Sequence, residues 1–157
     1  MQPNTTPLYI FDIDGTLCNI EHRLHYLQTK NWDGFYKACV DDEPNTSVIQ
    51  VMNKLLESGA DIYLFSARSE VVREETIQWL SRYTYYPMHE LRNNETLLTM
   101  RRDRDYTEDH ILKESWLNFM LEEDINRLVG VFDDRQRVVD MWRSRGITCF
   151  QVAAGEF

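Results

Sequence analysis

The feature that most constrains the fold of this 157-residue chain is the alternation of short apolar runs with amphipathic helical segments. Strands that alternate with helices form βαβ units, so the pattern predicts a mostly parallel sheet with helices on both faces. This is a three-layer α/β/α, Rossmann-like fold. The predicted strands span residues 8–13, 62–65, 96–100, 128–132 and 147–152, and the main helices 46–58, 69–82, 107–122 and 135–145.

The length and composition predict one domain over residues 1–157. Compact domains typically have ~100–150 residues, and 43% hydrophobic with 27% charged residues is typical of a folded chain rather than a disordered one. Residues 19–45 carry only short helical patterns, so we expect a small insert or minimal cap there. The three cysteines (Cys18, Cys39 and Cys149) form no C-x-x-C pair and are expected to be buried, reduced thiols.

The charge balance limits the partners that this chain can have. A net charge of −9 argues against nonspecific coating of nucleic acid, although 13 of the 17 basic residues are arginines, which suit a local phosphate contact. No apolar window is long enough for a signal peptide or a membrane span. We therefore expect a cytoplasmic protein without a membrane partner, and the oligomeric state stays open.

Polar residues follow three of the predicted strands at the point where each strand ends. The carboxyl ends of parallel strands share one edge of the sheet, where ligands bind, so these side chains should converge. Clustered carboxylates repel one another unless a cation lies among them, and an all-oxygen ligand set suits Mg²⁺. The strand ends carry Asp12 and Asp14, Ser66 and Arg68, and Asp133 and Asp134, and the four aspartates are the predicted metal ligands.

The segment Asp12-Ile-Asp14-Gly-Thr resembles the first signature of the haloacid dehalogenase (HAD) superfamily of phosphotransferases. Ser66, Lys113 and the Asp133-Asp134 pair fit the remaining signatures in order. The resemblance implies that Asp12 is a nucleophile that forms an aspartyl-phosphate and that Asp14 is the general acid and base. It also implies that Ser66 and Lys113 hold the phosphate oxygens while Mg²⁺ offsets their charge.

A closer similarity covers the chain from Ile10 to Phe157 and is weakest between about Tyr83 and Leu98. The stretch from Val131 to Phe157 is similar to the end of the phosphatase domain of bacteriophage polynucleotide kinases. That resemblance implies that Arg23, Arg68, Asp109 and Lys113 belong to the active site. Arg23 and Arg68 would bind the substrate phosphate, and Asp109 would pair with Lys113 four residues later and orient it. Because neither arginine lies in an apolar stripe, replacing either one is expected to leave the fold intact.

These observations predict a Mg²⁺-dependent phosphomonoesterase that removes 3′-phosphates from nucleic-acid ends or 3′-nucleotides, as in nucleic-acid repair. The alternative is a phosphatase of free 5′-nucleotides or other small phosphate esters. A phospho-accepting receiver domain is disfavoured by Asp14, and a non-catalytic binding module by the presence of both Asp12 and Asp14. No G-x-x-x-x-G-K-[ST] motif occurs, so no kinase domain is predicted.

Two further features are interpreted as structural rather than as nucleic-acid contacts. The run Arg101-Arg102-Asp103-Arg104 is interpreted as a solvated loop rather than a nucleic-acid contact. Four aromatic residues could stack on a base, but core packing or loop anchoring is the favoured role of each. These residues are Trp32, Tyr36, Tyr85 and Tyr86.

Overall fold

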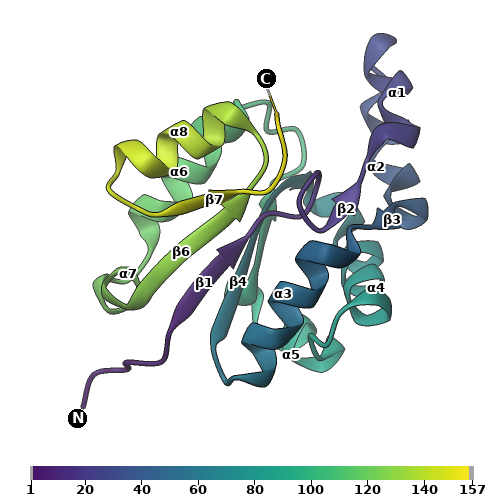
Figure 1. Cartoon of the computed structure of the whole chain (residues 1–157). Coiled ribbons are helices and arrows are strands. Elements are labelled where there is room, and N and C mark those ends of the chain that lie inside the picture. The colour runs from purple at the N-terminus through teal and green to yellow at the C-terminus, as the bar shows by residue number, and fades with distance from the viewer. Residues whose placement is uncertain (1, 156–157) are drawn as a thin grey trace.

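The computed structural model describes residues 2–155 and contains a five-stranded, fully parallel sheet. The strand order is β5-β4-β1-β6-β7, so the first strand of the chain lies at the centre (Figure 1). The strands are β1 (Leu8–Phe11), β4 (Asp61–Ser69), β5 (Leu98–Arg101), β6 (Leu128–Asp133) and β7 (Cys149–Gln151). The order confirms the parallel sheet that the alternating pattern predicts.

Helices cover both faces of the sheet, which gives the expected three layers. Residues of α3, α4 and α5 pack on one face, and residues of α6 and α8 pack on the other. The α-helices are α1 (His25–Gln28), α2 (Trp32–Lys37), α3 (Thr46–Glu57), α4 (Arg73–Tyr83), α5 (Met88–Asn93), α6 (Asp109–Phe119), α7 (Glu122–Arg127) and α8 (Gln136–Ser144). Short 3₁₀ turns are η1 (Glu21–Arg23), η2 (Ala38–Asp41), η3 (Glu70–Val72) and η4 (Glu95–Leu97).

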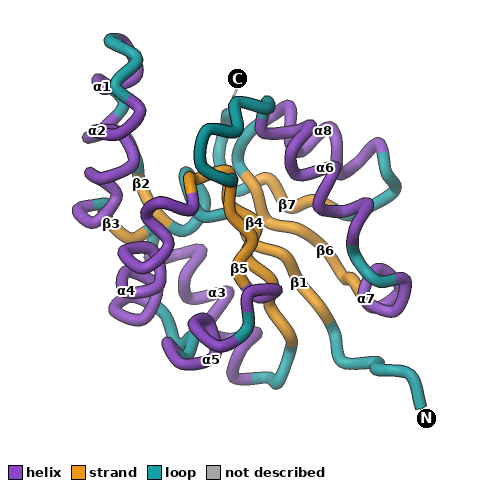
Figure 2. The backbone as a smooth tube through the Cα atoms, turned by 180° about the vertical axis from the view of Figure 1, so that it is seen from behind, coloured by secondary structure: helices purple, strands orange, loops and turns teal. Residues whose placement is uncertain are grey.

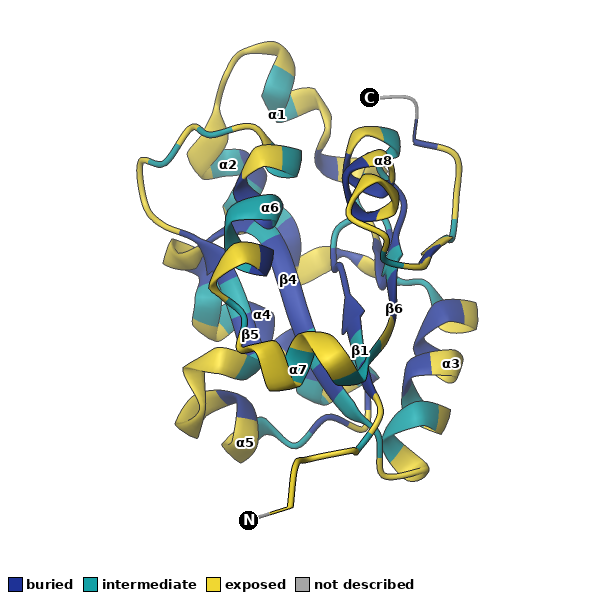
Figure 3. Ribbon diagram, turned by 90° about the vertical axis from the view of Figure 1, so that its left-hand side faces the viewer, coloured by how far each residue is buried: buried dark blue, intermediate teal, exposed yellow. Residues whose placement is uncertain are grey.

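The central strand β1 contributes to the core on both sides, because successive side chains of a strand point to opposite faces. Ile10 packs with the α6 and α8 cluster, whereas Phe11 packs with the α3 and α4 cluster. Both residues are completely buried. Figure 3 shows the same arrangement, with buried strands at the centre and more exposed helix surfaces outside. The residues that follow β1 are therefore fixed at the middle of the sheet edge.

The insert is closed at its base by a short antiparallel pair of strands. In this pair β2 (Cys18–Asn19) lies beside β3 (Glu43–Pro44). The segment between them forms η1, α1, α2 and η2, and α1 and α2 stand beyond the carboxyl end of the sheet (Figure 2). The helical hints in residues 22–28 and 32–39 are thus confirmed.

The predicted helix over 107–122 is wrong at both ends. It begins at Asp109 rather than next to Thr107, whose hydroxyl donates to the Asp105 carboxylate instead. It ends at Phe119, because Met120 and Leu121 adopt extended backbone angles before the separate helix α7 begins. The short helix α5 also lies in a region where the sequence predicts no element.

Two other expectations can be compared with the described residues. The three cysteines are buried and free, as predicted. Among the helices in residues 2–155, none combines the length and the apolar character that crossing a membrane would require.

Candidate active site

Asp12 lies directly after the central strand and is held by two side chains. Its Oδ1 accepts a hydrogen bond of 2.8 Å from Nζ of Lys113, and its Oδ2 accepts one of 3.0 Å from the Thr16 hydroxyl. Lys113 comes from α6 and also donates to Oδ2 of Asp133 at 2.8 Å. The lysine therefore bridges the ends of β1 and β6 and fixes the Asp12 carboxylate at the sheet edge.

Three carboxylates gather around this lysine. One carboxylate oxygen from each of Asp12, Asp133 and Asp134 lies within 4.8 Å of the other two. Burial raises the pKa of Asp12 well above its usual range, and the negative charge of Asp133 raises it further. Burial and Asp133 likewise raise the pKa of Asp134 to about 6. Three buried carboxylates against one ammonium leave an excess of negative charge, which fits a divalent cation.

Gly15 is required where the chain turns beside these carboxylates. Its φ of +81° lies in the left-handed region that favours glycine. A Cβ atom at this position would also overlap the carboxylate of Asp134. The Asp-Gly-Thr turn thus allows Asp134 to approach the backbone that carries Asp12 and Asp14.

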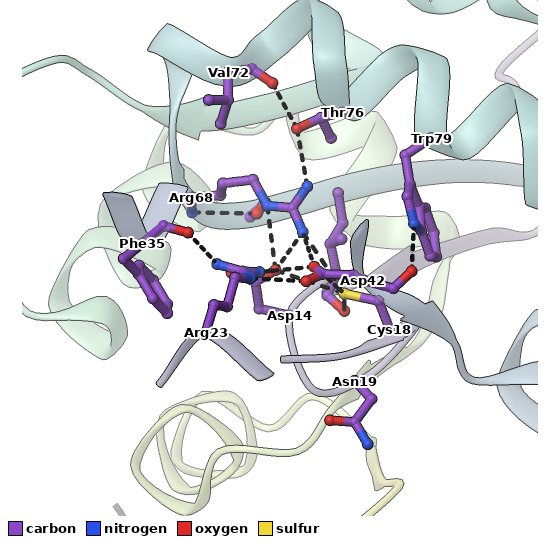
Figure 4. Close-up of polar contacts among 12 residues, drawn as sticks. Asp14, Cys18, Asn19, Arg23, Phe35, Asp42, Arg68, Val72, Thr76 and Trp79 are labelled. Atoms are coloured by element: carbon purple, nitrogen blue, oxygen red, sulfur yellow. Dashed lines mark hydrogen bonds and ion pairs between the residues drawn. The ribbon is translucent and has the colours of Figure 1, made fainter. Parts of the chain in front are cut away.

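The carboxylate of Asp14 lies among arginines rather than with the three others, and its role as a fourth metal ligand stays a prediction. Its Oδ1 accepts from Arg23 at 2.8 Å and from Arg68 at 2.5 Å (Figure 4). Burial raises the pKa of Asp14, but the positive charges of Arg68 and Arg23 outweigh it and lower the pKa to about 2. Asp14 is therefore an ionised carboxylate in the free protein at neutral pH.

Asp42, at the end of the insert, is the residue of this site that sequence reasoning missed. Its buried carboxylate accepts from Nε of Arg23 at 2.8 Å and from Arg68 at 3.1 Å. The Nε2 atom of His22 lies 2.6 Å from it. The backbone carbonyl of Asp42 also accepts from the buried Trp79 indole. Asp14 and Asp42 together balance the charge of the two arginines.

The arginine pair and Ser66 are buried behind Asp14, and none of these three lines the open cavity among the described residues. Arg23 is 0% exposed and packs over the Phe35 ring, while the Ser66 hydroxyl accepts from the backbone N–H of Arg68. In this arrangement the three side chains bond to protein partners, and their role in binding the substrate phosphate stays a prediction. Complete burial also overturns the expectation that either arginine can be removed without cost to the fold.

The predicted pair between Asp109 and Lys113 does not form. Lys113 is engaged by Asp12 and Asp133, and Asp109 instead accepts from Arg101 at 2.7 Å and from Arg135. The i,i+4 spacing places both residues on α6, but the two strand-end carboxylates attract the lysine more strongly because they are buried. Asp109 therefore connects the segment after β5 with the start of α8.

An open cavity of about 1100 Å³ lies above the carboxylates. Asp12, Asp14 and Lys113 line it together with Asp133 and Asp134. The insert forms one part of its wall, and the segment that links β5 to α6 forms another. The Asp12 carboxylate, the Lys113 ammonium and the Asp14 carboxylate thus share one accessible space. Phosphoryl transfer through an aspartate requires such a combination of groups.

The parallel sheet with this arrangement of acids defines the chain as a HAD-like α/β protein of the phosphatase class. Two solved structures that are 17% and 12% identical to this chain share the fold. The class C acid phosphatase from Bacillus anthracis has 17% identity and a TM-score of 0.59, over 85% of this chain and 53% of that one. The inferred phosphatase from Clostridium difficile has 12% identity and a TM-score of 0.60, over 94% of this chain and 85% of that one.

The family model of the polynucleotide kinase (PNKP) phosphatase domain matches residues 6–157, and the chain belongs to this family of phosphoric monoester hydrolases. A chain of the Pnkp1/Rnl/Hen1 RNA repair complex is 31% identical, with a TM-score of 0.76 over all of this chain and 46% of that one. The inferred bifunctional polynucleotide kinase/RNA ligase of Autographa californica nuclear polyhedrosis virus is 29% identical over 143 residues. Its match covers 90% of this chain but only 18% of the viral protein. The chain thus spans less than half of these relatives.

Proposed function

We propose that this domain removes 3′-phosphates from nucleic-acid ends or 3′-nucleotides in a Mg²⁺-dependent reaction. The observation that carries the proposal is the extent of the family match, which runs from residue 6 to residue 157 and includes every residue of the site. The relatives of known structure belong to an RNA repair complex, so RNA ends are the first substrates to test. The open form of the cavity supports a polymer end, because an enclosed site would suit a small phosphate ester better.

In the proposed reaction an oxygen of Asp12 attacks phosphorus and displaces the ribose oxygen, which leaves an aspartyl-phosphate. Lys113 holds the Asp12 carboxylate in place and puts a positive charge next to the phosphoryl oxygens. Water then attacks the aspartyl-phosphate, and inorganic phosphate leaves. Asp12, Asp133 and Asp134 would hold Mg²⁺, which when bound neutralises negative charge between the phosphate and the acids.

Asp14 would transfer the protons of both steps. Its low pKa in the free protein keeps it ionised, so it can accept a proton from the attacking water. To donate a proton to the leaving oxygen it must first be protonated, and the negative charge of a bound phosphate raises a carboxyl pKa in that direction. Arg23, Arg68 and Asp42 act on Asp14 by holding its position, so we interpret them as positioning residues.

The deciding experiment compares matched 3′- and 5′-phosphorylated RNA and DNA oligonucleotides and the corresponding mononucleotides, with released phosphate as the measurement. We expect turnover of the 3′-phosphorylated substrates with Mg²⁺ and none in excess EDTA. Asp12→Asn is the control for contaminating phosphatase. A clear preference for 5′-mononucleotides would replace the proposal with the alternative, and full turnover in EDTA would contradict the metal requirement.

A further inference from the structure

The cavity above the carboxylates is much larger than a phosphate group needs. Its volume of about 1100 Å³ is slightly above the ~300–1,000 Å³ range of small-molecule sites. The five charged residues at its base account for the chemistry, but they leave the two walls without a role. Those walls are the α2 part of the insert and residues 102–108, which join β5 to α6.

Trp32 on the insert wall is an exposed ring in a fixed position. Its ring is stacked on Tyr36 with centroids 6.3 Å apart and meets the edge of Phe35 at the same distance. Phe35 is in turn anchored on the buried Arg23, whose guanidinium lies 4.4 Å from its ring centre. The side chain of Asn31 caps α2 by accepting from the Gly34 N–H. Despite these contacts, Trp32 remains 46% exposed on the cavity wall.

Tyr106, on the segment that joins β5 to α6, is also an exposed ring on a fixed backbone. It is 79% exposed. Arg101 donates to the carbonyl oxygens of Asp105 and Thr107 at 2.9 and 2.6 Å, one on each side of Tyr106. The Asp105 carboxylate also accepts from the backbone N–H and hydroxyl of Thr107. The loop is therefore held in place while its tyrosine ring packs against little else.

We propose that Trp32 and Tyr106 form a subsite for the base of the terminal nucleotide, while its phosphate lies at Asp12. This inference rests on the proposed function and assigns the aromatic residues a role in binding the nucleoside. Aromatic side chains bind bases of any sequence because every base has a π-face. Rings already held by neighbours lose little conformational freedom when a base stacks on them, which favours binding. The subsite favours nucleotides over phosphate esters that lack a ring.

The test uses two 3′-phosphorylated dinucleotides that differ only at the terminal nucleotide, which carries a base in one and is abasic in the other. Trp32→Ala and Tyr106→Ala should each raise KM for the first substrate by roughly 5- to 150-fold, the usual effect of removing a stacking ring. Neither substitution should change KM for the abasic substrate. Tyr85→Ala is the matched control, because Tyr85 is 63% exposed but lies outside the cavity lining.

Conservative variants separate loss of the ring from loss of the fold, and a binding measurement gives a result that does not depend on turnover. Trp32→Phe and Tyr106→Phe retain a ring and should retain most of the preference for the base. Trp32 is the most exposed tryptophan of the described chain, since Trp79 and Trp142 are buried and Trp116 is intermediate. Titration with the base-bearing dinucleotide should therefore quench tryptophan fluorescence in the wild type but not in Trp32→Phe.

Two different failures can be distinguished. If the wild type hydrolyses both dinucleotides with equal KM and Trp32→Ala changes neither, the subsite is refuted while the 3′-phosphatase proposal stands. If no 3′-phosphate is hydrolysed, the proposed function fails. The same fluorescence titration with a 5′-mononucleotide and its abasic analogue then decides on the subsite, because quenching by both or by neither overturns it.

Discussion

Replacing Asp42 by asparagine tests whether the buried arginine pair depends on this carboxylate. Asp42 has no exposed side-chain surface, and its two oxygens accept from Arg23 and Arg68. Asparagine keeps the shape but removes the charge, so two buried guanidiniums would share the single negative charge of Asp14. Removing one partner of a buried ion pair costs about 3–5 kcal/mol, because the remaining charge stays buried without compensation.

That loss should appear as a lower unfolding temperature. For a domain of this size each 1 kcal/mol corresponds to roughly 2–4 °C, so Asp42→Asn should lower Tm by roughly 6–20 °C. Thermal and urea unfolding are the assays, and the Mg²⁺-dependent turnover should fall as Arg23 and Arg68 lose their fixed positions. Glu57→Gln is the matched control. Its partner Lys54 is largely exposed, and no measurable change is expected.

A second substitution tests the electrostatic reason directly. In the double variant Asp42→Asn with Arg23→Gln, one positive charge disappears together with the negative one. The loss of stability should then be smaller than the sum of the two single losses, with a coupling of about 0.5–3 kcal/mol. The reasoning is refuted if the free energy of unfolding of Asp42→Asn lies within about 1 kcal/mol of the wild-type value, or if the two losses of stability are simply additive.

Three other substitutions follow from the geometry of the site. Asp12→Asn should abolish phosphate release. Its unfolding temperature without metal should be unchanged or higher, because one of three clustered carboxylates loses its charge. Turnover at the wild-type rate would exclude Asp12 as nucleophile. Asp14→Asn should lose more activity on alkyl than on aryl phosphates, because an alkoxide needs a proton to leave and acid catalysis contributes roughly 10²–10⁴-fold; equal losses would argue against the acid role. Gly15→Ala should reduce both stability and turnover, measured in parallel, because a methyl group would displace the Asp134 carboxylate; wild-type behaviour would show that the turn can adjust.

The sequence predicts the parallel sheet and the strand-end acids because both depend on local pattern. Asp12 and Asp133 follow apolar runs, and parallel pairing is enough to bring them to one edge. The partners of the charged side chains depend on tertiary contacts instead. The spacing of Asp109 and Lys113 suggests a pair. Lys113 instead bonds to Asp12 and Asp133, which lie 101 and 20 residues away from it in the chain.

Asp42 was missed because it lies in the insert, where no strand end or regular period indicates a role. The available signal was the adjacent acidic pair Asp41-Asp42 close before Asn45, together with the arginine surplus. Neither shows which acid faces inward. The structure distinguishes them, because Asp42 is 2% exposed and bonds to both buried arginines. Burial of charge is a property of the assembled fold, so local pattern does not reveal it.

The central place of β1 in the sheet has a consequence for the order in which the protein forms. Its two neighbours are β4 and β6, so one edge of β1 stays without a hydrogen-bonding partner until residues 128–133 have been synthesised. At roughly 5–20 residues per second, the strand that positions Asp12 waits several seconds on the ribosome. An unpaired apolar strand edge invites pairing with other chains, so shortened translation products that end before β6 should aggregate rather than act as partial enzymes.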